Sequence, residues 1–265
     1  MVGILIKISA LITLTLPLKA QLPPSTCPKV GGNQATEPAS ETLYKVNDKI
    51  RVIGTQEIYK KWDGTKKAII TIDQMPKNTR EGDLVILMVA GSGGKTDSPA
   101  PAGTWSLINR VWNVDIFVGA YYKVYSSTGP KTFHVGRSNK RFAALTTLRG
   151  VDISDPIVDS KTDSDSSPLR KGAVAPGVKS VAGGALFVGF AMDNPVVYQQ
   201  GDIQKMEVLF SYGPGWPGAG NVDDALTGAV ESTIGGSTGK RTARLSDERG
   251  HCNGSEISIS LKPAP

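Results

Sequence analysis

From residue 50 onward, apolar and polar side chains alternate in short runs, and this pattern predicts a succession of β-strands. Residues 114–126 show it most clearly, because Ile116, Val118, Ala120 and Tyr122 fall on alternate positions. A period of two places these side chains on one face of a strand. The segment DLVILMVAG, residues 83–91, is apolar almost throughout, which indicates a strand buried on both faces.

Further short apolar segments are separated by turn residues such as glycine, proline and asparagine. They are residues 50–58, 66–75, 141–150, 185–192, 205–213, 223–232 and 256–263. Regularly spaced short strands, without a long stretch of helical period, favour an all-β fold. We therefore expect a single antiparallel β-sandwich domain over residues 46–265, of jelly-roll or immunoglobulin-like character.

The first 20 residues allow two interpretations. An early lysine, an apolar stretch from Ile8 to Leu18 and a Leu-Lys-Ala triplet ending at Ala20 match a secretory signal peptide, which we favour. The same segment also has apolar residues on alternate positions from Ile4, the pattern of a strand. Such an apolar N-terminal arm could pair with the sheet edge of a neighbouring subunit. Residues 21–45 are rich in Pro, Gly, Ser and Thr and predict a linker.

The composition argues against nucleic acid as a partner, and the cysteine count is consistent with an exported protein. Hydrophobic residues make up 39% of the chain, enough for a core, and the formal net charge is +6. The basic residues are scattered rather than clustered with aromatic residues, so we expect no nucleic-acid binding. Cys27 and Cys252 are the two cysteines of the chain. An even count in an exported protein favours a disulfide between them, and two unpaired thiols are the alternative.

The segment LVILMVAGSGGKTDSPAPAG, residues 84–103, matches a nucleotide-binding loop only in part. A P-loop needs a glycine five positions before its Gly-Lys-Thr, and that position is Val89. The prolines that follow oppose the helix that would face the phosphates. We therefore expect no nucleotide, and we interpret the glycines as a turn after a core strand.

Short motifs in and around this stretch are together similar to a known family of domains. The residues concerned are Gly82-Asp83, Pro101-Ala102-Gly103 with Trp105, and Arg149-Gly150-Val151-Asp152 with Pro156. In this order they resemble a family of β-sandwich domains that is common in bacteriophage tail, fibre and other virion-associated proteins and also occurs in secreted bacterial proteins. Thr104 displaces the tryptophan by one position, and Lys123 stands where an arginine is common. The resemblance covers about residues 50–263 and implies a fold and a setting, but no catalytic residues.

Residues 151–168 form an acidic segment that we expect to be a loop. Its carboxylates at Asp159, Asp163 and Asp165 are candidate ligands for calcium, a hard ion that prefers oxygen. The glycine and the distal glutamate of a calcium loop are absent, and two nearby basic residues can neutralise the charge. A solvated loop is therefore favoured over a calcium site, and no other cofactor is expected.

Nothing in the sequence forms a recognisable catalytic group. His134 lies in a segment with strand character. His251 precedes Cys252, and adjacent residues of a strand point to opposite faces. The serines in glycine-rich stretches lack the pattern of a nucleophile elbow. We therefore expect no enzymatic activity, and an unrecognised polysaccharide-active enzyme stays as one alternative.

Aromatic residues near turns are the best candidates for binding. Tyr212 and Trp216 belong to a glycine- and proline-rich stretch, and Trp105 follows another. Exposed rings stack on sugars or anchor protein interfaces, whereas rings that close the ends of a sandwich are the commoner case. We favour a non-catalytic structural or adhesive protein, displayed on a phage virion or secreted to the cell surface. Its partners would be further copies, other virion or surface proteins, or a glycan held as in a carbohydrate-binding module.

Overall fold

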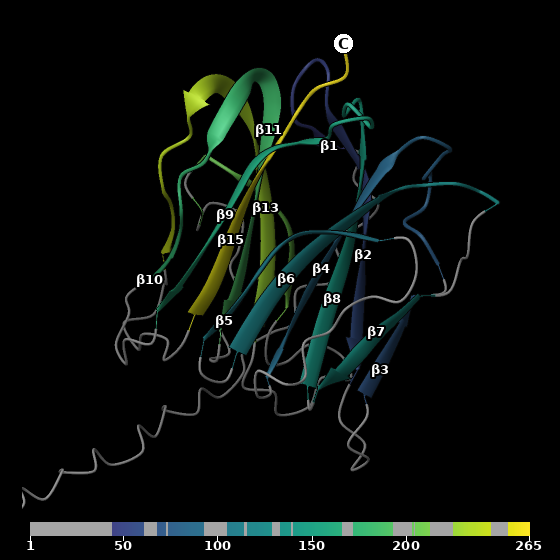
Figure 1. Ribbon diagram of the computed structural model, residues 1–265, viewed down its shortest axis with the longest axis vertical. Coiled ribbons are helices and arrows are strands. Elements are labelled where there is room, and N and C mark those ends of the chain that lie inside the picture. The colour runs from purple at the N-terminus through teal and green to yellow at the C-terminus, as the bar shows by residue number, and fades with distance from the viewer. Residues whose placement is uncertain are drawn as a thin grey trace, which may run out of the picture.

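The computed structural model describes residues 44–60, 68–72, 74–92, 105–113, 116–128, 133–138, 140–165, 172–192, 203, 205–212, 225–244 and 254–265. Within these ranges every regular element is a β-strand and every pairing of strands is antiparallel (Figure 1). The predicted all-β class is therefore confirmed. The same residues contain no helix that is long and apolar enough to cross a membrane.

The first sheet has six strands. Their order across the sheet is β1 (Tyr44–Lys45), β2 (Arg51–Lys60), β8 (Lys140–Arg149), β4 (Leu84–Ser92), β6 (Ile116–Val124) and β5 (Ser106–Asn113). Because β1 pairs only with Arg51 and Val52, most of β2 has no partner strand on that side among the described residues. The other edge of the sheet is β5.

The second sheet has five strands and lies to the left of the first in Figure 1. Their order is β12 (Glu207–Tyr212), β13 (Ala225–Ser237), β11 (Lys179–Met192), β15 (Gly254–Leu261) and β9 (Ile157–Asp165). Two short ribbons complete the described structure. They are β3 (Ala68–Ile72) with β7 (Phe133–Ser138), and β10 (Gly172–Ala175) with β14 (Arg241–Arg244).

The largest buried cluster contains side chains from both sheets, and we call it the shared cluster. Strand β4 contributes Leu84, Ile86 and Met88 to it, and β11 contributes Phe187. The sheets approach closely at Gly189, where a Cβ atom would lie 1.8 Å from the Cε atom of Met88. The absence of a side chain at Gly189 therefore makes room for Met88.

Each sheet also buries apolar side chains on the face turned away from the shared cluster. In the first sheet this outer cluster includes Val85, Leu87 and Val89 of β4. Strand β4 is thus buried on both faces, as its continuous apolar sequence predicted. In the second sheet the outer cluster joins residues of β11 to the alanines of the β10–β14 ribbon.

The two ends of the sheets carry different features: one has a hydrogen bond between the sheets, and the other has the sequence motifs. At one end, Asn113 of β5 donates a hydrogen bond to the backbone oxygen of Gly254 at 3.0 Å, linking the sheets. Tyr212, which is opposite Leu226 in the strand register, ends β12 at this same end. The other end contains the residues of the Gly-Asp and Arg-Gly-Val-Asp motifs.

Two predictions from the sequence are corrected by the pairing of the strands. Residues 157–165 are not a loop but the edge strand β9, which is paired with β15 along its length. Polar side chains are tolerated there because an edge strand is open to solvent. The predicted linker ends before Tyr44, because Tyr44–Lys45 already pairs with β2. Residues 1–43, which include Cys27, lie outside the described residues, as do Trp216, His251 and Cys252.

Candidate functional site

The Gly-Asp and Arg-Gly motifs meet in an ion pair. Arg149, the last residue of β8, donates from Nε and Nη2 to the two carboxylate oxygens of Asp83 at 2.8 and 2.7 Å. Asp83 is buried and also accepts the backbone N–H of Arg80 at 2.7 Å. These contacts raise the pKa of Arg149 above its ordinary value. Because this carboxylate binds both a distant arginine and the turn that precedes it, its role is structural.

The Val-Asp part of the motif fastens the C-terminal segment. Asp152 pairs with Lys262 at 3.0 Å, and its backbone N–H binds the backbone oxygen of Lys262 at 2.9 Å. Hydrogen bonds from Ser154 and Lys262 lower the pKa of Asp152 to about 2. Gly150 has a φ of 85°, and a Cβ there would lie 1.9 Å from the backbone oxygen of Lys49. The turn therefore requires glycine at this position.

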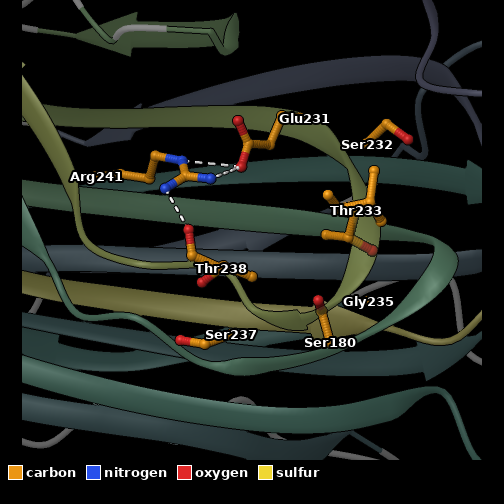
Figure 2. A pocket seen from close by; sticks show the side chains of 9 residues that line it. Ser180, Glu231, Ser232, Thr233, Gly235, Ser237, Thr238 and Arg241 are labelled. Carbon is orange, nitrogen blue, oxygen red and sulfur yellow. Dashed lines mark hydrogen bonds and ion pairs between the residues drawn. The ribbon is translucent and has the colours of Figure 1, made fainter.

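A hollow of about 140 Å³ lies beside the end of β13 (Figure 2). Glu231 in this hollow accepts a hydrogen bond from Nε of Arg241 at 2.8 Å and forms an ion pair with its Nη2. Nη1 of Arg241 donates to the backbone oxygen of Thr238 at 2.6 Å. Thr233 donates its hydroxyl to the backbone oxygen of Val181 at 2.7 Å. These polar groups bind one another or the nearby backbone, so the residues that line the hollow serve to stabilise a tight bend of the chain.

The candidate calcium ligands lie in line along β9. Asp159 and Asp163 share one face of the strand and are separated by about 13 Å of backbone, and Asp165 is the last residue of β9. Asp159 accepts the backbone N–H of Lys179 at 2.8 Å. In the described part of the chain, no three His, Cys, Asp or Glu side chains form a group that could hold a metal ion. Calcium binding stays a prediction, without added support from this geometry.

The three aromatic residues predicted to bind a ligand are not brought together. Tyr212 ends β12 at one edge of the second sheet, whereas Trp105 directly precedes β5 at an edge of the first. Strand β12 contacts β2, and β5 contacts β9, so these edges lie on opposite sides. Trp216 lies outside the described residues. Of the three, only Trp105 has side-chain contacts that the structure describes.

Trp105 belongs instead to a cluster of aromatic and cationic side chains on the outer face of β5 and β6. Nζ of Lys123 lies 5.8 Å from the centroid of the Trp105 ring. The guanidinium of Arg110 lies 4.9 Å from the centroid of the Trp112 ring. Arg110 also forms a hydrogen bond with Tyr121, whose pKa is raised by burial. We call these five residues the aromatic–cationic face.

A β-bulge explains why the sequence did not reveal this face. The register of β5 on β6 shifts between Leu107 and Asn109. A bulge changes which alternate positions point to each side of a strand. Odd-numbered Trp105 and Leu107 therefore share a face with even-numbered Arg110 and Trp112. The uneven spacing matches neither a simple strand nor a helix, although the mixture of Trp and Arg in residues 105–112 was a visible signal.

Glu57 of β2 is a partly buried titratable group outside this face. It is opposite Ala144 of β8, a member of the shared cluster, so its side chain points between the sheets. Desolvation raises the pKa of Glu57 to about 7, and its Oε2 atom is buried without a hydrogen-bond partner. No other titratable group contributes to this shift. Among the residues that the structure describes, no second acid or base accompanies Glu57 as general acid–base catalysis would require.

Comparisons with protein-family models, with curated proteins and with solved structures found no match to this chain.

Proposed function

We propose that the chain is a non-catalytic β-sandwich protein that acts by adhesion or assembly at an external surface, either displayed on a phage virion or secreted. The two antiparallel sheets and their shared cluster support the sandwich. The family resemblance of the Gly-Asp and Arg-Gly-Val-Asp residues supports the setting. Both motifs hold chain segments together, as expected of a structural domain.

The observation on which the adhesive role rests is the aromatic–cationic face. Large aromatic side chains and arginine are enriched where proteins bind partners. Here they are concentrated on an edge strand, where Arg110 is exposed and both Trp105 and Trp112 keep part of their surface accessible. A face of this composition favours binding over a purely architectural role. It also supports the second candidate, a carbohydrate-binding module, with Trp105 in place of the Trp216 segment.

The setting is tested by the intact mass of the native, non-reduced protein recovered from its source. A mass that begins at Gln21, found in the culture medium, supports secretion. A mass that begins at Met1, found in purified particles, supports virion display with an N-terminal arm. Recovery only from the cytosol, without particles, would contradict both settings. Turnover of any member of a polysaccharide panel would contradict the non-catalytic role.

A further inference from the structure

The outer face of β5, an edge strand of the first sheet, presents a row of side chains that are exposed or partly buried. Leu107 is 49% exposed and Arg110 is exposed, while Trp105 and Trp112 are partly buried at either end of the row. From Trp105 to Trp112 the strand rises by about 20 Å. A row of this length fits an extended chain rather than a single small molecule.

Arg110 is the exposed cation in this row. Its guanidinium is fixed between the Trp112 ring and the Tyr121 hydroxyl, while the residue as a whole is exposed. A guanidinium held in one plane presents paired N–H groups that match a carboxylate. Lys123 differs, because it is only 6% exposed and burial lowers its pKa. Lys123 is therefore the less accessible of the two cations, and it lies over the Trp105 ring.

We propose that the outer face of β5 binds an acidic polysaccharide that lies along the strand. Arg110 pairs with a carboxylate of the polymer, and exposed Leu107, together with the parts of Trp105 and Trp112 that stay accessible, contacts its sugar rings. The formal net charge, +6 for the whole sequence and +4 without residues 1–20, adds some long-range attraction for a polyanion. This inference rests on the proposed adhesive function and names the ligand class of that same face.

The test uses the full chain and two purified polymers, polygalacturonate as the acidic probe and dextran as the neutral one. Affinity is measured by titration calorimetry at two salt concentrations. We expect binding to polygalacturonate that weakens with salt, and no comparable binding to dextran. Arg110→Gln should reduce the affinity about tenfold or more, because it removes a charged hydrogen-bonding partner. Arg51→Gln is the matched control, since Arg51 is an exposed arginine of β2 near the opposite edge of the sheet.

A second pair of variants tests the position independently of Arg110. Leu107→Glu adds a negative charge within the row and should abolish binding by repulsion. Ile234→Glu adds the same charge at a 94% exposed site on β13 and should leave binding unchanged. Circular dichroism melting curves establish that all four variants are folded.

Three outcomes would overturn the inference. They are equal losses in Arg110→Gln and Arg51→Gln, equally tight binding of dextran, and no binding of either polymer by the wild-type chain. The setting in the proposed function is judged separately by the intact mass and location of the native protein. A failure of polysaccharide binding is therefore distinguishable from a failure of that setting.

Discussion

Arg149 and Asp83 lie 66 positions apart in the chain, yet their side chains form two parallel hydrogen bonds of 2.8 and 2.7 Å. Asp83 is 3% exposed, so this arginine rather than water is the main polar partner of its side chain. The pair joins the start of β4 to the end of β8, two neighbouring strands near the centre of the first sheet.

Arg149→Met should therefore destabilise the protein by about 2 kcal/mol, because it leaves a buried carboxylate without its cation. The free energy of unfolding is measured by urea denaturation. Lys45→Gln is the control, because it removes an exposed ion pair with Asp48, and we expect no measurable change from it. Equal stability of Arg149→Met and the wild type would contradict the structural role of the motif.

Gly150→Ala should prevent folding or cost more than about 2 kcal/mol. The added Cβ meets the backbone oxygen of Lys49 at 1.9 Å, and the φ of 85° is itself unfavourable for alanine. Gly82→Ala separates these two effects, since Gly82 has a φ of 81° and open space around a Cβ. We expect Gly82→Ala to cost only about 1 kcal/mol. The melting temperatures of the two variants decide the comparison.

Gly189→Ala should destabilise the core by about 1 to 3 kcal/mol through overpacking against Met88. Met88→Ala in the same background should recover part of that loss, because it removes the atoms that clash. A double-mutant cycle measured by chemical denaturation gives the coupling between the two sites. Strictly additive effects would show that the sheets do not meet at this point.

Stability should depend on pH through Glu57. Its pKa is about 7 in the folded protein and near 4.5 when unfolded, so the folded state binds the proton more tightly. The resulting stabilisation is complete below pH 4.5 and is lost as the pH rises through 7, by at most about 3 kcal/mol. Glu57→Gln should flatten this part of the curve and stabilise the protein at pH 8. An unchanged profile in Glu57→Gln would assign the pH dependence to other groups.

The sequence predicted the strands whose side chains alternate regularly or are apolar throughout, such as β4 and β6. The sequence did not predict strands whose residue composition depends on their place in the fold. Strand β9 is polar because it lies at an edge, and its acidic residues suggested a loop. Strands β10 and β14 have four residues each and bury mainly alanines, too little to give a pattern.

The candidate site was predictable only in part, for a related reason. Trp105 was chosen from the sequence, but its neighbours Arg110 and Trp112 share its face only because of the bulge in β5. A register shift depends on the pairing with β6, and single-strand periodicity does not report that pairing. The raised pKa of Glu57 was not predictable from the sequence, because it arises from burial in the fold and not from neighbouring residues in the chain.

The order of strands in the two sheets has a consequence for the kinetics of folding. Strand β2 pairs with β8 about 90 residues later, and β15, the last of the described strands, lies between β11 and β9 in the second sheet. Non-local pairings of this kind make folding slow, because distant segments must meet before any contact is gained. The second sheet cannot close until residues 254–261 have been synthesised. We therefore expect the first sheet, whose strands all lie within residues 44–149, to be able to form before the second sheet, which has to wait for residues 254–261.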